Sequence, residues 1–214
     1  MKPELKHLVI FARRPQLGQV KRRLARDIGA VAALQVYRTL LQRTIRLLGH
    51  DARWRTWLAV TPDSARSGPE PCWPAGLPRV AQGAGDLGQR MGRVLNALPP
   101  GHAVIVGTDI PDIAANHVQA AFRRLQEADA VFGPAADGGY WLAGFRRFPP
   151  APLPFAGVRW SSPAALADTF ANCPPAWRIG LIDELADMDS GDDWRAWRRR
   201  VAERTQARKT APNA

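Results

Sequence analysis

The sequence predicts an α/β protein, a single-domain three-layer α/β/α fold built around a mostly parallel, twisted sheet. Short apolar segments alternate with segments of helical periodicity through residues 1–130, as in sheets whose parallel strands are joined by helices. Several apolar segments are continuous and end in Gly or Pro, which is typical of strands buried on both faces. The composition, 46% hydrophobic and 23% charged, is that of a globular chain.

The strands expected from these patterns are short. They are His7–Arg13, Trp54–Val60, Arg79–Gln82, Ala103–Thr108, Asp129–Gly133, Tyr140–Phe145 and Arg178–Ile182. The clearest helix is Ala30–Leu48, whose apolar residues recur at steps of three and four and which Gly49 would end. The further expected helices are 19–26, 87–98 (with Asp86 as N-cap), 116–127, 163–171 and one that starts at Trp194.

The chain of 214 residues suits one well-buried domain. It has no internal repeat and no clear linker. We expect residues 1–205 to form this single domain and residues 206–214 to be a disordered basic tail.

The apolar runs are too short to cross a bilayer, so we expect no membrane span. Residues 1–15 have a short apolar core and no small-residue cleavage site, and they predict a first strand rather than a signal peptide. Cys72 and Cys173 are isolated, without the spacing of a disulfide framework or a zinc site. We expect a cytoplasmic protein; the sequence does not indicate its oligomeric state.

The net charge of +11 raises the question of nucleic-acid binding. Most of the 30 basic residues are Arg, and they cluster in Arg13–Arg26 and Arg195–Lys209. No aromatic-interleaved RNA-binding motif and no helix-turn-helix pattern accompanies these clusters. We therefore do not expect dedicated nucleic-acid binding, and a phosphate-bearing small molecule would suit the first cluster equally well.

The first strand leads into a turn that ends at Gly18, with Lys21 and Arg23 following near the start of a helix. Backbone N–H groups, the helix dipole and the two cations would then point at one anion, which favours phosphate binding. The spacing is neither that of a Walker motif nor that of the dinucleotide fingerprint. The alternative is a solvated basic helix face.

The segment Ala103–Asp112 places Gly107, Thr108 and Asp109 at the end of a buried strand. Open α/β sheets bind their ligands at this end of their strands. An Asp beside nucleotide phosphates usually holds a divalent metal, because Mg²⁺ and Mn²⁺ prefer hard oxygen ligands. Alternatively, Asp109 caps the next helix or stabilises its own turn.

A third turn, Asp137, Gly138 and Gly139, follows a further strand, and the two glycines let the backbone bend tightly against a ligand. In a doubly wound sheet the three turns would lie along one edge. Cations for phosphates at one strand end and a carboxylate for a metal at another make a nucleotide-diphosphate site. Three ordinary turns are the alternative.

Four motifs, FARRPQLGQVKRRLA, GDLGQRM, GTDIPD and GPAADGGYWLAG, resemble in this order those of the DUF2064 family. The resemblance covers residues 7–194. It implies a fold like that of glycosyltransferases of type A (GT-A), within the nucleotide-diphospho-sugar transferase superfamily. It also implies a nucleotide-activated donor, a small-molecule acceptor and a divalent metal, Mg²⁺ or Mn²⁺.

The resemblance assigns roles to individual residues. Lys21 and Arg23 match the phosphate-binding positions, while Arg22 stands where the family usually has Thr. Asp109 matches the metal-binding Asp of the superfamily, although Gly107 means that the strict D-x-D motif is missing. The residues that match the segment expected near the base or ribose are Gln82, Asp86 and Gly88.

The acidic segment Asp187–Asp193 resembles the D-x-D-T-P-E-D segment near the end of many nucleotidyltransferases. By this resemblance Asp189 is a second candidate metal ligand, which would require the segment to fold back over the sheet. The alternative is a solvated acidic turn that caps the helix starting at Trp194.

The leading hypothesis is a metal-assisted glycosyltransferase acting on a nucleotide-diphospho-sugar. Asp137 would act as a general base or bind acceptor hydroxyls, or else only stabilise its loop. Lys21 would neutralise charge on the departing phosphate. Gly138, Gly139, Tyr140 and Trp160 would line the substrate, although an aromatic residue such as Trp160 is more often a buried core residue. A nucleotidyltransferase that uses an NTP and a non-catalytic nucleotide- or RNA-binding protein are the alternatives.

Overall fold

The computed structural model describes residues 5–68, 71–147 and 152–210. Each of the predicted strands is present, within a residue or two of its expected bounds. The strands are β1 Lys6–Arg13, β2 Arg55–Thr61, β3 Arg79–Ala81, β4 His102–Val106, β5 Ala130–Pro134, β6 Tyr140–Arg146 and β7 Ile179–Leu181. The helices are α1 Arg22–Ile28, α2 Ala30–Leu48, α3 Leu87–Ala97, α4 Ala115–Arg124, α5 Ala165–Ala171 and α6 Gly191–Thr210, with a short 3₁₀ helix, η1, at Asp63–Arg66.

The strands form one seven-stranded sheet in the order β3-β2-β1-β4-β6-β5-β7. The neighbours in β3-β2-β1-β4 are parallel, as are β5 and β7. Only β6 is reversed, antiparallel to both β4 and β5. Residues 135–139 alone join β5 to β6, and so short a connection permits a hairpin but no crossover. The mostly parallel sheet predicted from the sequence is confirmed.

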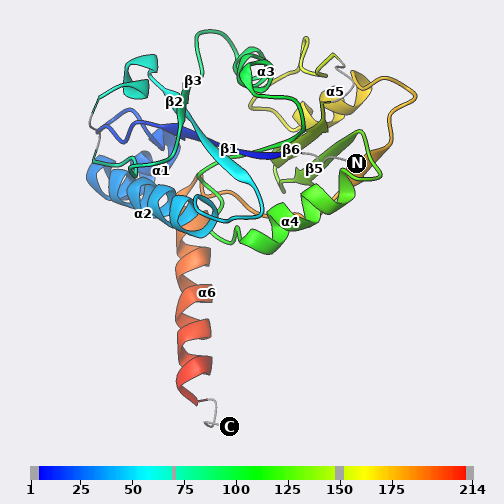
Figure 1. The fold of residues 1–214 in the computed structure, drawn as a ribbon. Coiled ribbons are helices and arrows are strands. Elements are labelled where there is room, and N and C mark those ends of the chain that lie inside the picture. The colour runs from blue at the N-terminus through cyan, green and yellow to red at the C-terminus, as the bar shows by residue number, and fades with distance from the viewer. Residues whose placement is uncertain (1–4, 69–70, 148–151, 211–214) are drawn as a thin grey trace.

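Helices cover both faces of the sheet, which gives the predicted three layers (Figure 1). Side chains alternate between the two faces along each strand. In β1, Leu8 and Ile10 belong to the core that also contains buried residues of α2 and α4, such as Leu41 and Phe122. Val9 belongs instead to the opposite core, under α3.

The start of α3 is fixed by a capping box. The Asp86 carboxylate accepts a hydrogen bond from the Gln89 backbone N–H at 2.8 Å, and the Gln89 side chain accepts one from the Asp86 N–H at 3.1 Å. Both donors belong to the group that a helix start otherwise leaves unpaired. The prediction of Asp86 as N-cap is confirmed.

The last helix, α6, projects from the body of the molecule (Figure 1). Its first residue is tied to α1, because the Gly191 N–H donates to the Asp27 carboxylate at 2.7 Å. The helix continues to Thr210, so residues 206–210 of the expected tail are part of α6. Residues such as Gln, Ala, Arg and Lys favour such an extension. Residues 211–214 of that tail lie outside the described residues. Within the described ranges, no helix has the length and apolar character needed to cross a membrane.

The carboxyl ends of β1, β4 and β5 meet at one edge of the sheet, because these strands run in the same direction. A later segment, 182–190, crosses the same edge. It is held there by backbone hydrogen bonds from Ile182 to Phe132, from Leu185 to Pro134 and, at 3.0 Å, from the Met188 N–H to the Asp109 carbonyl. Four segments that are distant in the sequence therefore share one site.

Candidate functional site

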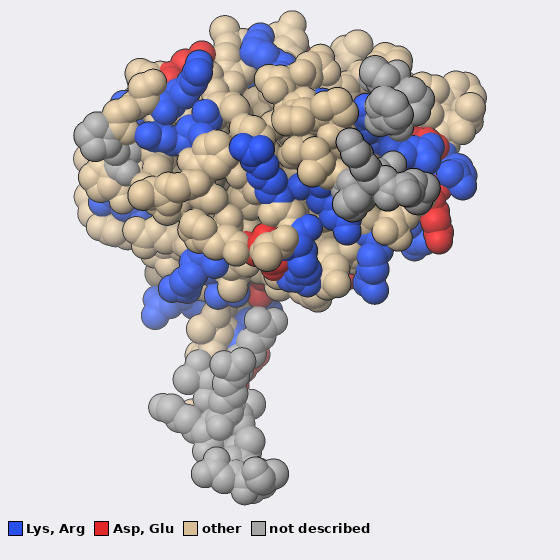
Figure 2. Space-filling view, viewed as in Figure 1, with Lys and Arg blue, Asp and Glu red and all other residues tan. Residues whose placement is uncertain are grey.

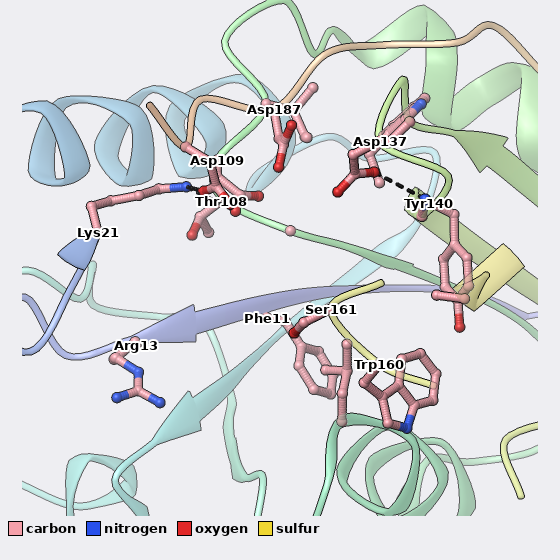
Figure 3. A pocket seen from close by; sticks show the side chains of 18 of the residues that line it. Phe11, Arg13, Lys21, Thr108, Asp109, Asp137, Tyr140, Trp160, Ser161 and Asp187 are labelled. Atoms are coloured by element: carbon pink, nitrogen blue, oxygen red, sulfur yellow. Dashed lines mark hydrogen bonds and ion pairs between the residues drawn. The ribbon is translucent and has the colours of Figure 1, made fainter. Parts of the chain in front are cut away.

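A cavity of about 810 Å³ opens at this edge. Its walls come from the segments that follow β1, β4 and β5 and from 187–189, as the sequence predicted for the first three (Figure 3). The view in Figure 2 shows Lys and Arg side chains gathered around a small acidic patch in the middle of one face of the molecule. The cavity is thus large enough for a nucleotide-sized ligand and carries both signs of charge.

Three carboxylates meet on one side of the cavity. Asp109, Asp187 and Asp189 each offer an oxygen, and these oxygens lie within 4.8 Å of one another. The hydrogen bond from Met188, which is fully buried, to the Asp109 carbonyl places its two acidic neighbours beside Asp109. The position before Thr108 is Gly107, where a Cβ atom would lie 2.6 Å from the Asp109 carboxylate. Glycine here leaves space for the Asp109 side chain.

Lys21 lies among these carboxylates. Its ammonium donates to Asp109 at 3.0 Å and to Asp189 at 2.7 Å, and only 7% of its side chain is exposed. Arg23 is more distant, 3.8 Å from Asp189, and 72% exposed. The backbone of Lys21 is left-handed, with φ 47°, and it forms the N-cap of α1. A non-glycine residue rarely adopts this conformation, and such strain is concentrated at functional sites.

The carboxylates carry more negative charge than Lys21 neutralises. Burial alone would lower the pKa of Lys21, but the charges of Asp109 and Asp189 outweigh it and raise that pKa. Burial and the neighbouring charges of Asp189, Asp109 and Asp137 raise the pKa of Asp187 to about 6. Hard oxygen donors with surplus negative charge are the chemistry that Mg²⁺ or Mn²⁺ requires, so the residues present fit a divalent cation.

Asp137, Tyr140, Trp160 and Ser161 also line the cavity, and Asp137 lies beside Asp187 (Figure 3). One Asp137 oxygen accepts the Gly139 N–H at 2.9 Å. The Tyr140 ring packs edge-on against Trp160, and its hydroxyl accepts a hydrogen bond from Thr169. Ser161 is exposed and left-handed, with φ 58°. Lys21 and Ser161 are the only non-glycine residues with positive φ in the described part of the chain, and both line the cavity.

Most of the residues predicted for the site line this cavity. They are Lys21, Arg23, Gln82, Thr108, Asp109, Asp137, Gly139, Tyr140, Trp160 and Asp189. The predicted residues that do not line it are Gly18, Asp86, Gly88 and Gly138.

Two of these residues outside the cavity have structural roles in α3. Asp86 is the helix cap described above. Gly88 lets α3 approach its neighbours, because a Cβ atom there would lie 2.7 Å from both Phe155 and Trp160. Neither contributes to the cavity wall, and the base or ribose contact that the resemblance implied for them stays a prediction.

Gln82 lines the cavity but has no free polar atom for a ligand. It is 1% exposed, its amide donates to the Ala12 and Ala59 carbonyls, and its Oε1 accepts from the Arg90 guanidinium. Its role is therefore to orient Arg90, which also lines the cavity.

Sequence reasoning missed Asp187, Arg13, Arg90 and Ser161 as parts of the wall. For Asp187 a signal existed, since it is the first acid of the D-x-D pattern that contains Asp189. Arg90 resembles any exposed arginine of an amphipathic helix, and only its contact with Gln82 distinguishes it.

Comparison with known proteins identifies the family of the chain. A family model described as "Uncharacterized protein conserved in bacteria (DUF2064)" matches residues 44–162, more than half of the chain. The match begins after Lys21 and ends before Asp187. No curated protein matches the sequence.

Solved structures share the fold. The structure of a candidate nucleotide-diphospho-sugar transferase from Desulfovibrio desulfuricans G20 is 28% identical, with a TM-score of 0.78 over 90% of this chain and 85% of that chain. Two more distant matches agree in fold alone. Glucosyl-3-phosphoglycerate synthase from Mycobacterium tuberculosis, solved with Mn²⁺, UDP and glucosyl-3-phosphoglycerate, is 14% identical with a TM-score of 0.56, over 99% of this chain and 82% of that chain. The 4-diphosphocytidyl-2C-methyl-D-erythritol synthase from Anaerococcus prevotii DSM 20548 is 11% identical with a TM-score of 0.55, over 89% and 94%.

Proposed function

This chain belongs to the DUF2064 family, and we propose that it is a metal-dependent transferase that uses a nucleotide-activated donor, specifically a nucleotide-diphospho-sugar. One observation carries the proposal. Three carboxylates and a buried lysine converge at the carboxyl ends of β1 and β4, inside a cavity large enough for such a donor. The similarity to the structure from Desulfovibrio desulfuricans supports it.

The carboxylates of Asp109, Asp187 and Asp189 would hold the cation. Bound there, Mg²⁺ or Mn²⁺ supplies positive charge to phosphate oxygens of the donor. The Lys21 ammonium binds the same phosphates once it exchanges its carboxylate partners for them, and the exposed Arg23 guanidinium attracts the anionic donor to the cavity. Both groups stabilise the negative charge that grows on the departing diphosphate.

Asp137 is placed to act on the acceptor. It lies across the cavity from Lys21, and one of its oxygens is held by the Gly139 N–H while the other remains available (Figure 3). That oxygen accepts the proton of an acceptor hydroxyl or orients it for attack. Ser161 and Trp160 complete the wall on this side. A hydroxyl-bearing acceptor suits these groups.

A thermal-shift panel tests this function. Nucleotide-diphospho-sugars and NTPs are added with and without Mg²⁺ or Mn²⁺. Stabilisation by a nucleotide-diphospho-sugar only when metal is present supports the proposal, because a ligand that binds the folded state raises its stability. Stabilisation by NTPs alone would indicate a nucleotidyltransferase instead. No response to any nucleotide, with strong salt-sensitive RNA binding, would overturn both enzyme functions.

A further inference from the structure

The two sides of the cavity that flank the phosphate-binding groups differ in chemistry. One side carries Asp137 and Ser161, which both accept hydrogen bonds and so suit the hydroxyls of a sugar or an acceptor. The other side lies at the ends of β1 and β2 and carries Arg13 and Arg90, whose guanidiniums only donate (Figure 3 shows Arg13).

Gln82 fixes the Arg90 guanidinium in place. The Gln82 side chain is buried, and its amide donates to the Ala59 carbonyl at 2.6 Å and to the Ala12 carbonyl at 3.2 Å. These two bonds define which way its Oε1 points, and this oxygen accepts from Arg90. A guanidinium held by a side chain that cannot rotate presents its remaining donors in one direction.

Arg90 has donor capacity to spare. Its Nη2 donates to Gln82, its Nη1 has no hydrogen-bond partner among the described residues, and no carboxylate in the described ranges forms an ion pair with it. Burial and the nearby charges of Arg13 and Arg93 lower the pKa of Arg90 from its ordinary value. A ligand with hydrogen-bond acceptors therefore gains free energy at this position.

On the premise of the proposed function, we propose that Arg90 contacts the keto edge of the donor's base and so selects guanine or uracil over adenine and cytosine. The diphosphate is fixed near Lys21, and the sugar must extend toward Asp137, so the base occupies the side with the two arginines. Guanine offers O6 and N7 as acceptors and uracil offers its carbonyl oxygens. Adenine and cytosine place an amino group on the corresponding edge. This group donates hydrogen bonds, and a guanidinium has no acceptor for them.

Calorimetry with GDP, UDP, ADP and CDP, each with Mn²⁺, tests the selection. We expect the wild-type protein to bind GDP or UDP about tenfold or more tightly than ADP and CDP, in keeping with the discrimination of a good arginine–base contact. Arg90→Met and Arg90→Gln should reduce this preference to less than about threefold. Arg123→Gln, which removes the same charge from an exposed position of α4, is the control and should retain the preference.

Each result decides the matter. A wild-type protein that binds all four nucleotides equally overturns the selection but leaves the proposed function standing. Arg90 variants that bind all four nucleotides more weakly by the same factor also overturn the selection and leave the proposed function standing. Arg90 would then contact a phosphate or only support the fold. A wild-type protein that binds none of the four with Mn²⁺ overturns the proposed function and the selection together. The wild-type comparison requires no variant to fold.

Discussion

The Lys21 ammonium lies 2.7 Å from the carboxylate of Asp189, a residue 168 positions away in the sequence. It sits between this carboxylate and Asp109, where a divalent cation would bind. Lysine and metal therefore compete for the same oxygens until a phosphate draws the ammonium away.

The competition between Lys21 and the metal predicts that removing the lysine strengthens metal binding. We expect Lys21→Met to raise the affinity for Mn²⁺ in the absence of nucleotide by roughly tenfold, equivalent to about 1.4 kcal/mol. The same variant should bind nucleoside diphosphates more weakly, because it lacks the phosphate partner. Titration calorimetry measures both affinities. Arg23→Met, which removes an exposed cation, should change the Mn²⁺ affinity little, and a Lys21→Met protein that binds Mn²⁺ more weakly than wild type would refute the competition.

The metal ligands can be separated from the other carboxylate of the cavity. We expect Asp109→Asn and Asp189→Asn each to weaken Mn²⁺ binding by about tenfold or more, because an amide oxygen brings no negative charge to the cation. Asp137→Asn is the matched control and should retain the Mn²⁺ affinity within a few-fold, since Asp137 is not one of the three converging carboxylates. Electron paramagnetic resonance of free Mn²⁺ gives the affinities. Equal losses in all three variants would count against a site made by Asp109, Asp187 and Asp189.

Two glycines of α3 should respond oppositely to the same substitution. A Cβ atom at Gly88 would collide with Phe155 and Trp160 at 2.7 Å, whereas at Gly92 the nearest atom is 3.9 Å away. We expect Gly88→Ala to lose about 1–3 kcal/mol of unfolding free energy through overpacking. Gly92→Ala should gain about 0.5–1 kcal/mol through helix propensity. Urea denaturation measures both, and a neutral Gly88→Ala would show that α3 does not depend on this close approach.

The positions of the strands and helices were largely predictable from the sequence. The reversed direction of β6 and part of the site were not. Buried strands leave continuous apolar runs such as 103–106, and Lys21 and Asp109 stand at the ends of such strands, where ligands bind. Gly88 had the same appearance as a ligand-binding glycine, because a sequence does not reveal which atoms surround a backbone position. The role of Arg90 depends on the rotamer of Gln82, which only tertiary packing determines.

At the edge of the sheet opposite the cavity, Asp129 makes the stability of the fold depend on pH. Asp129 joins the starts of β5 and β7 and the end of β6, because its carboxylate accepts the Arg178 N–H at 2.9 Å and pairs with Arg146. Burial opposes ionisation, but these contacts prevail and lower the pKa of Asp129. A carboxyl with a lowered pKa stabilises the fold above its unfolded-state pKa, and this contribution disappears as the pH falls through the folded-state pKa.

We therefore expect Asp129→Asn to lose about 1.5 kcal/mol of unfolding free energy at neutral pH. The difference from wild type should shrink below about pH 4. Urea denaturation at neutral pH and below about pH 4 measures this difference in unfolding free energy. Glu127→Gln, on the exposed surface, is the control. A difference that stays constant with pH would mean that the ionised carboxylate is not what stabilises this corner.

The most direct measurement of the central claim is a crystal soaked with Mn²⁺ and a nucleoside diphosphate, with the metal located by its anomalous scattering. We expect one Mn²⁺ coordinated by oxygens of Asp109, Asp187 and Asp189, with the diphosphate beside it and the Lys21 ammonium moved onto a phosphate oxygen. A bound nucleotide whose Mn²⁺ lies away from these three carboxylates would contradict this expectation.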